Sequence, residues 1–236
     1  MKSSGSSDPN CVRQVYDQDA RSYDVSRQAT PFLRRLDASE RKVLRQHIIG
    51  TDNVIEVGAG TGRLTGLLLE LSDSVLAVDY SPKMLATLEG KFKYRNNLST
   101  AVWNLYELQA LPNYGTYDVL VSMRVVPHLD DFSHALRILG NAVRPGGTVI
   151  VDFWNRHSYV YAKKRSSHVY NHYATWNEVV QTVEAVGLTL LHIEAAGFIG
   201  PKNVNLDFLC TSPLKRFAYS LITICKRPLP TYASAP

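Results

Sequence analysis

The stretch VIEVGAGTGRLTG, from Val54 to Gly66, joins an apolar run to a glycine-rich turn and then to a leucine-rich segment. This order predicts a strand, a glycine turn with few side chains and a helix. The strand is expected to be buried and parallel to its neighbours, because apolar residues occupy both of its faces. Backbone amides next to the start of a helix favour a nucleotide-like ligand.

The alternation of strand and helix continues on both sides of this stretch. It predicts strands at residues 53–60, 74–80, 100–105, 117–123 and 147–154, and helices at 39–48, 62–71, 81–92, 132–143 and 175–187. Two late strands, at 188–198 and 217–227, are joined by a connection that contains Pro201 and Pro213. A helical crossover fits poorly there, so we expect this pair to be antiparallel. The pattern as a whole predicts an α/β fold with a mostly parallel sheet and helices on both faces.

Composition sets outer bounds on the function. The 236 residues carry 26 Lys and Arg against 21 Asp and Glu, a net charge of +5, which suits but does not require an acidic partner. No apolar run approaches the roughly 20 residues of a membrane-spanning helix. Cys11, Cys210 and Cys225 are widely spaced without a CxxC pair, which argues against a disulfide framework and fits a reducing, cytoplasmic location. We expect one domain over residues 1–236, with residues 1–10 as a polar, disordered leader.

The spacing of the glycines distinguishes this turn from a dinucleotide-binding turn. The glycines at 58, 60 and 62 read G-x-G-x-G, whereas dinucleotide-binding turns read G-x-G-x-x-G; the position of the last glycine in that pattern holds Arg63. Glu56, just before the turn, is unfavourable beside a pyrophosphate and suits a ligand with positive charge. Asp79 ends the next strand, where its two oxygens can accept the hydroxyls of a ribose.

The segments EVGAGTG and AVDYSPKML together resemble the class I S-adenosylmethionine-dependent methyltransferases. YELQALP, YDVLVSMRVVPHLDD, VRPGGTVIVDFWN and TWNEVVQTVEAVGL resemble later family segments in the same order, so the resemblance covers about residues 16–227. It implies a Rossmann-like seven-stranded sheet with a C-terminal antiparallel strand pair. It also implies S-adenosyl-L-methionine as cofactor, with S-adenosyl-L-homocysteine as product, and a small-molecule acceptor.

The resemblance also assigns residues to the cofactor. The glycines would let the backbone approach its methionine and ribose portions, Glu56 would hold the amino end, and Asp79 would bind the ribose hydroxyls. Tyr80 would lie against the adenine, and Glu107 stands where the family usually has an aspartate facing the adenine amino group. The expected cofactor contacts are Glu56, Gly58, Ala59, Gly60, Gly62, Asp79, Tyr80, Met84, Glu107, Leu108, Ser122 and Met123.

Residues 11–35 resemble the lid helices of small-molecule members of the family, and segments 155–175 and 197–217 are expected to cover the acceptor pocket. His128 follows the fourth strand and is the candidate general base, because histidine titrates near neutral pH. The alternative is a structural histidine that caps its turn. Tyr23 is the second candidate catalytic residue. The expected acceptor contacts, for which helix packing and surface charge are the alternatives, are Tyr16, Arg27, Trp154, Tyr159, Tyr170, His172, Tyr173 and Phe208.

Several ligand classes are not expected. His168 and His172 have i, i+4 spacing without a third ligand, so no metal site is predicted. SMRVVP lacks the Asn/Asp-Pro-Pro-aromatic tetrad of relatives that methylate nucleic-acid bases. We therefore expect methyl transfer to an oxygen or nitrogen of a natural product, a sugar or a quinone-like molecule, by a monomer or homodimer. Carbon methylation, a peptide or protein acceptor, a catalytically silent partner protein and an oxidoreductase remain alternatives.

Overall fold

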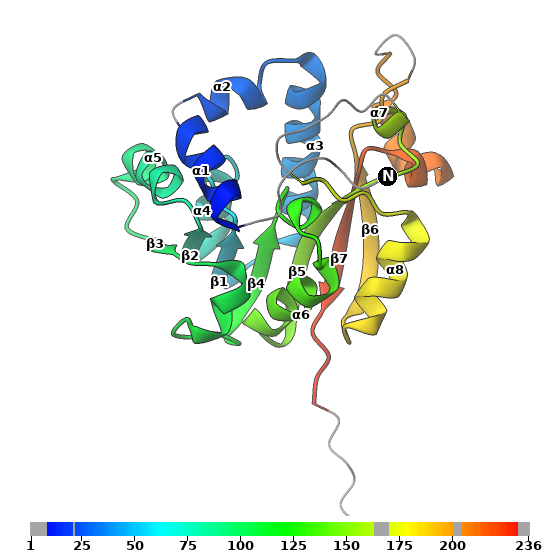
Figure 1. Cartoon of the computed structure of the whole chain (residues 1–236). Helices are drawn as coiled ribbons and strands as arrows, with labels where there is room; N and C mark the ends of the chain where they lie inside the picture. The colour runs from blue at the N-terminus through cyan, green and yellow to red at the C-terminus, as the bar shows by residue number, and fades with distance from the viewer. Residues whose placement is uncertain (1–8, 21, 163–169, 201–203, 231–236) are drawn as a thin grey trace, which may run out of the picture.

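The computed structural model describes residues 9–20, 22–162, 170–200 and 204–230, and within them seven strands form one sheet in the order β3-β2-β1-β4-β5-β7-β6 (Figure 1). β7 runs antiparallel to both β5 and β6, and the other neighbouring strands pair in parallel. The predicted fold class, including the late antiparallel pair, is confirmed. The strands are β1 Thr51–Val57, β2 Ser72–Asp79, β3 Leu98–Val102, β4 Tyr117–Ser122, β5 Val143–Trp154, β6 Thr189–Ala196 and β7 Ser220–Lys226.

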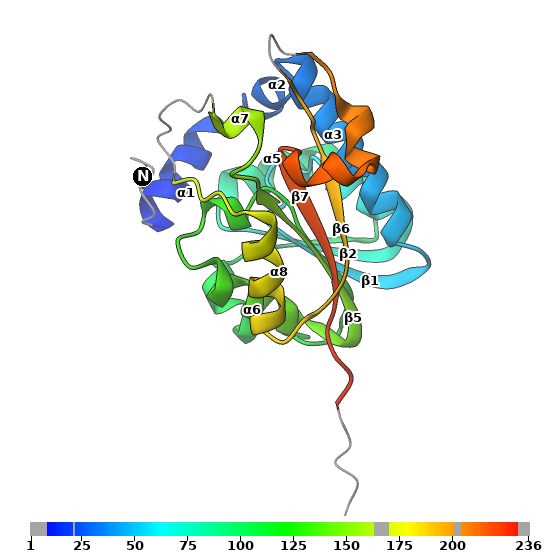
Figure 2. The same ribbon diagram turned by 90° about the vertical axis from the view of Figure 1, so that its right-hand side faces the viewer.

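Helices cover both faces of this sheet. α3 (Pro31–His47), α4 (Thr65–Leu71) and α5 (Pro82–Phe92) pack on one face. The 3-10 helix η1 (Leu105–Ala110), α6 (Phe132–Ala142) and α8 (Trp176–Ala185) pack on the other. Figure 2 shows α6 and α8 across the sheet from α3.

The alternation of strand side chains explains the two layers. Val54, Val119 and Val121 point to the core under α3 and α4, whereas Ile55 and Leu120 point to the core under α6 and α8. Successive side chains of a strand face opposite sides, so the continuous apolar runs of β1 and β4 fill both cores at once.

One helix begins earlier than the sequence pattern suggested. The helix predicted from Ser39 is the second half of α3, which starts at Pro31. Thr30 is its N-cap, and its side chain accepts a hydrogen bond from the backbone N of Leu33 at 3.2 Å. Ser81 caps α5 in the same way, ahead of Pro82, as predicted. A capping side chain followed by proline marks both helix starts.

The N-terminal helices α1 (Pro9–Asp19) and α2 (Tyr23–Arg27) lie above the carboxyl ends of β1, β2 and β4 (Figure 1). α1 begins two residues inside the predicted leader, whose first eight residues lie outside the described ones. The predicted cover segments contain α7 (Tyr159–Ala162) and two 3-10 helices, η4 (Asp207–Thr211) and η5 (Pro213–Phe217); their residues 163–169 and 201–203 are not described. In the described part of the chain, no helix combines the length and apolarity that crossing a membrane requires.

Candidate active site

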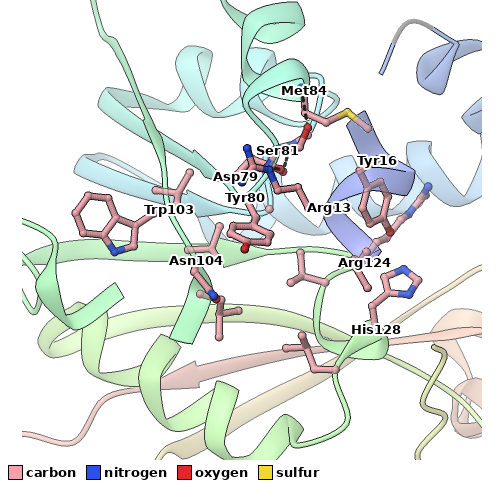
Figure 3. Close-up of a pocket in the computed structure, with 18 of the residues that line it drawn as sticks. Arg13, Tyr16, Asp79, Tyr80, Ser81, Met84, Trp103, Asn104, Arg124 and His128 are labelled. Atoms are coloured by element: carbon pink, nitrogen blue, oxygen red, sulfur yellow. Dashed lines mark hydrogen bonds between the residues drawn. The ribbon is translucent and has the colours of Figure 1, made fainter. Parts of the chain in front are cut away.

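A cavity of about 400 Å³ opens between the carboxyl ends of the central strands and helix α1 (Figure 3). It joins residues from the lid, the glycine turn and the ends of β2 and β4. Nine of the predicted site residues line it: Tyr16, Tyr23, Gly58, Gly60, Asp79, Tyr80, Met84, Met123 and His128. The cavity therefore brings together six of the twelve predicted cofactor contacts and both candidate catalytic residues.

The glycines of the turn have different roles. Gly58 has a φ of 78°, and a Cβ there would lie 2.1 Å from Cγ2 of Val125, on the segment that follows β4. Gly60 has a φ of 56° and lines the cavity with open space above it. Gly62 does not line the cavity; a Cβ there would lie 2.7 Å from Cε2 of Phe92 in α5. The third glycine thus serves packing of the turn against α5.

Asp79 lies at the centre of the cavity wall. Its Oδ2 accepts a hydrogen bond from the backbone N of Gly60 at 2.8 Å, and its Oδ1 accepts one from the backbone N of Ser81 at 2.8 Å. Burial raises the pKa of Asp79, against the effect of the backbone amides that hold the charged form. A carboxylate offers about four acceptor positions, so Asp79 can still receive hydroxyl groups from a ligand.

Glu56 lies beneath the turn and not on the cavity. Its side chain is buried, with 4% exposure, and Thr65 Oγ1 donates to Oε2 at 2.5 Å. Burial raises the pKa of Glu56 to about 7. Ala59 is also buried away from the cavity, and its backbone N donates to the carbonyl of Val78. These two predicted contacts are not among the residues that line the cavity.

The segment after β3 presents different residues from those predicted. Glu107 is exposed and Leu108 is in the core, and neither lines the cavity. The chain leaves the strand at Val102 and enters η1, with Asn104 as its N-cap accepting from the backbone N of Tyr106 at 3.1 Å. Trp103, Asn104, Leu105 and Tyr106 line the cavity instead. An asparagine at a helix start is a recognised capping signal, which the prediction of a strand through residue 105 overlooked.

The lid is fixed to the cavity by polar contacts. Asp17 of α1 accepts a hydrogen bond from Ser81 Oγ, and the guanidinium of Arg13 lies 5.5 Å from the centre of the Tyr80 ring. Asp24 of α2 accepts from Thr61 Oγ1 at 2.6 Å and pairs with Lys91. Desolvation opposes ionisation of Asp24, but the contacts with Lys91 and Thr61 outweigh it and lower its pKa.

His128 lies on the cavity in the short 3-10 helix η2 (Val126–His128). Its Nδ1 is 3.0 Å from the carbonyl oxygen of Tyr170, so in the neutral ring Nδ1 carries the hydrogen and Nε2 is the acceptor. The ring centre is 6.4 Å from that of Tyr16 in the lid and 5.0 Å from that of Trp154. The contact with Tyr170 supports both interpretations of His128, since it holds the turn and also fixes the tautomer.

The comparisons with known proteins agree with this geometry. Residues 55–149 match the family model described as a methyltransferase domain. An uncharacterized methyltransferase of Mycobacterium bovis is 33% identical over 105 residues, which cover 44% of this chain and 51% of the relative. Residues 55–149 are therefore similar to a methyltransferase domain, and the similarity covers less than half of the chain.

One further sequence relative and one solved structure are also similar to this chain. A ubiquinone biosynthesis O-methyltransferase of Xanthomonas campestris is 26% identical over 108 residues, covering 44% of this chain and 43% of the relative. The chain thus spans about half the length of the sequence relatives that it matches. The crystal structure of magnesium protoporphyrin IX methyltransferase from Synechocystis PCC 6803 superposes with a TM-score of 0.65 at 17% identity, covering 93% of this chain and 100% of that one.

Some of the predicted acceptor contacts form a group of aromatic rings behind His128 and not on the main cavity. The Trp154 ring is 5.6 Å from that of Tyr173, which is 4.8 Å from that of Tyr161. Burial raises the pKa of Tyr173 to about 12. The predicted acceptor contacts that do not line the cavity are Trp154, Tyr159, Tyr170, His172, Tyr173 and Phe208.

Some of these residues have a visible alternative role. The backbone N of His172 donates to the carbonyl of Pro127 at 2.6 Å, and its ring packs on Phe132, so His172 ties the 170–174 segment to the His128 turn. Phe208 in η4 is 70% exposed. Ser122 is fully buried off the cavity. The side chain of Arg27 is outside the described part of the molecule.

Arg63 belongs to a buried ionic cluster, which we define as Asp37, Glu40, Arg41, Arg63 and Arg124. Nη1 of Arg63 lies 2.6 Å from both Asp37 Oδ1 and Glu40 Oε2. Glu40 is fully buried and also binds Arg124, which lines the cavity. Arg63, which occupies the position of the last glycine in the dinucleotide pattern, therefore links the glycine turn to α3. Arg124 is a site residue that the prediction missed, although it directly follows Met123.

The described residues contain no group of three histidine, cysteine, aspartate or glutamate side chains arranged to hold a metal ion. His172 is turned to Phe132 and Tyr170, and its predicted spacing partner His168 is outside the described ranges.

Proposed function

We propose that this chain binds S-adenosyl-L-methionine and transfers its methyl group to an oxygen or nitrogen of a small-molecule acceptor. The observation that carries the proposal is one cavity lined by a G-x-G-x-G turn, a carboxylate at the end of β2 and a histidine after β4. The relatives named above support it, since each is a methyltransferase, one named for O-methylation and one crystallised with S-adenosyl-L-homocysteine.

The residues present fit this cofactor. Asp79 would accept the ribose hydroxyls, because its oxygens already face the cavity from a backbone cradle. Tyr80 and Asn104 would contact the adenine, and the bare backbone of Gly58 and Gly60 would lie along the methionine portion. Met123 lies where the strand end meets the turn and would adjoin the sulfur.

The bound cofactor supplies an electrophilic methyl group on a sulfonium, so little further activation is needed. The protein's part is to orient the acceptor and, for a hydroxyl or ammonium acceptor, to take up a proton. His128 Nε2 is the group available for that proton, since Nδ1 faces the Tyr170 carbonyl. Tyr16 and Tyr23 of the lid would hold the acceptor from above and keep water out.

The acceptor class rests on the cavity's chemistry. Aromatic side chains from two separate segments line it together with His128: Tyr16 of α1, and Trp103 and Tyr106 after β3. Such a wall suits a flat, partly apolar acceptor and fits a quinone-like or natural-product ring. A peptide acceptor and a catalytically silent partner protein remain the competing proposals. A cytoplasmic, monomeric or homodimeric single-domain protein remains our expectation.

Isothermal titration with S-adenosyl-L-homocysteine tests the binding part of the proposal. The wild type should bind, and Asp79→Asn should bind about tenfold to a hundredfold more weakly, because one charge-assisted acceptor is lost. Asp73→Asn on the same strand is the matched control, since Asp73 is exposed to solvent. Heat from NADH and none from the homocysteine compound would favour an oxidoreductase, and no heat from either would favour the silent partner protein.

The transfer step needs a separate test. The protein should release S-adenosyl-L-homocysteine from S-adenosyl-L-methionine in the presence of some member of a panel of phenols, amines and sugars. Product only with peptides or proteins would replace the small-molecule acceptor with a protein one.

A further inference from the structure

The backbone of Arg124 is held in a rare conformation at the cavity wall. Its φ is 63°, in the left-handed region that non-glycine residues seldom occupy. Asp152, which is fully buried in β5, accepts a hydrogen bond from the backbone N of Arg124 at 2.5 Å. Such conformations persist where the surroundings enforce them, and they cluster at functional sites. The fold thus directs this arginine against the cavity.

Glu40 fixes one edge of the Arg124 guanidinium. Oε1 of Glu40 lies 3.0 Å from Nε, and Oε2 lies 2.9 Å from Nη2. The Arg124 side chain is only 8% exposed, and that of Glu40 is fully buried. This two-point pairing sets the orientation of the planar group as well as its position.

The other edge of the guanidinium is unused. Nη1 of Arg124 has no hydrogen-bond or ion-pair partner among the described residues. It is not sealed in the protein either, because Arg124 Nη1 is not among the fully buried side-chain nitrogen and oxygen atoms of the described residues that lack a hydrogen bond. Arg124 lines the cavity, and Figure 3 shows it between Tyr16 and His128. Two N–H donors therefore remain for a ligand.

Carboxylates balance the charge of the arginines around Arg124. Three guanidiniums, those of Arg41, Arg63 and Arg124, make ion pairs with two carboxylates, those of Asp37 and Glu40. Asp152 contacts Arg124 through the backbone amide and not through the guanidinium. Asp152 nevertheless interacts electrostatically with Arg124 and Arg63, and burial raises its pKa only to about 6, so at neutral pH its carboxylate offsets the third guanidinium. The unused N–H edge of Arg124, and not a net charge of the cluster, is what favours an anionic ligand group.

We propose that Nη1 of Arg124 binds a carboxylate oxygen of the bound ligand, and that Glu40 is a positioning residue that acts through Arg124. The inference rests on the proposed function. Two sources share this chemistry: the amino-acid carboxylate of the cofactor and an acidic group on the acceptor.

Titration calorimetry with two adenosyl compounds separates the sources. S-adenosyl-L-homocysteine carries the carboxylate, and 5′-methylthioadenosine lacks the amino-acid end. If the cofactor is the source, Arg124→Met weakens binding of the first about tenfold to a hundredfold and leaves the second unchanged. If the acceptor is the source, both compounds bind normally, and the variant loses the binding of benzoate that the wild-type complex with S-adenosyl-L-homocysteine shows. Glu40→Gln should weaken the same carboxylate-dependent binding that Arg124→Met weakens, by a smaller factor.

Matched controls come from an exposed ion pair of the same composition. Arg45 and Glu70 are 55% and 57% exposed, so Arg45→Met and Glu70→Gln should leave every affinity unchanged. The double variant Glu40→Leu, Arg124→Met removes both charges together and keeps the test valid if a single variant fails to fold; it should melt cooperatively and still lose the carboxylate-dependent binding. An Arg124→Met variant that binds both adenosyl compounds and benzoate with wild-type affinity overturns the inference. Wild-type protein that binds neither adenosyl compound instead overturns the proposed function.

Discussion

Replacing Glu56 with glutamine should stabilise the fold above neutral pH far more than in weak acid. Glu56 is buried beneath the glycine turn, and burial raises its pKa from 4.5 to about 7. The folded protein therefore binds this proton more tightly than the unfolded chain does. The contribution of the protonated Glu56 carboxyl to the free energy of unfolding is fully present below pH 4.5. It is lost as the pH rises to about 7.

The size of this effect follows from the gap between the two pKa values. The gap is about 2.5 pH units, between 4.5 and about 7. At about 1.4 kcal/mol per unit, the ionised carboxylate lowers the free energy of unfolding by about 3 kcal/mol above neutral pH. Glutamine keeps an oxygen for the Thr65 hydroxyl but adds a buried amide donor, whose cost of about 1–3 kcal/mol does not depend on pH.

Urea unfolding followed by circular dichroism at about pH 5 and about pH 8 isolates the part of the stability change that comes from ionisation of Glu56. The change in unfolding free energy caused by Glu56→Gln should be more favourable at the higher pH by about 2–3 kcal/mol. Glu70→Gln is the control, because Glu70 is 57% exposed and should give the same small change at both values. An equal effect of Glu56→Gln at both pH values would refute the assignment of a raised pKa to this carboxyl.

The remaining predictions concern binding, turnover, the turn and the lid. Asp79→Ala should weaken S-adenosyl-L-homocysteine binding by about 1–3 kcal/mol in calorimetry; unchanged affinity would remove Asp79 from the ribose site. His128→Ala should slow turnover of an identified acceptor by about 10²–10⁴-fold if His128 is a general base, and near-normal turnover would restore its structural role. Gly58→Ala should destabilise the protein by more than about 2 kcal/mol in urea unfolding, because the added Cβ meets Val125, whereas Gly50→Ala adds a Cβ in open space at a similar φ and should cost less; equal costs would contradict the clash. Asp24→Ala should speed hydrogen exchange in residues 9–27 without lowering the melting temperature, because it removes the contacts with Thr61 and Lys91; unchanged exchange would show that these contacts do not hold the lid.

The fold was predictable because its signals are local. The apolar run before Gly58, the caps at Ser81 and the proline-interrupted late connection each act over a few residues. The missed start of α3 also had a local signal in Thr30 and Pro31, which the prediction did not use. The strand expected through residue 105 was wrong for a different reason: one turn of 3-10 helix after Asn104 moves Glu107 to the surface and Leu108 into the core.

The site was only partly predictable, because some of its contacts join distant residues. Glu40 and Arg124 are separated by 84 positions, and nothing near either residue indicates the pairing. The carboxylate of Glu56 is held below the turn by a hydrogen bond from the hydroxyl of Thr65, nine positions further along the chain. Trp154 and Tyr173 were expected to contact the acceptor, but their position relative to the cavity depends on how the 170–174 segment crosses the Pro127 turn.

The place of β7 in the sheet has a consequence for biosynthesis. β6 precedes β7 in the chain, yet it touches the rest of the sheet by way of β7, which lies between it and β5. While the ribosome is still making residues 220–226, β5 has an open edge and β6 has no strand to join. Nascent protein at that stage exposes two unpaired strand edges, the kind of surface that recruits chaperones or promotes aggregation. Loss of this last strand should therefore leave β5 with an open edge and β6 without a neighbour in the sheet.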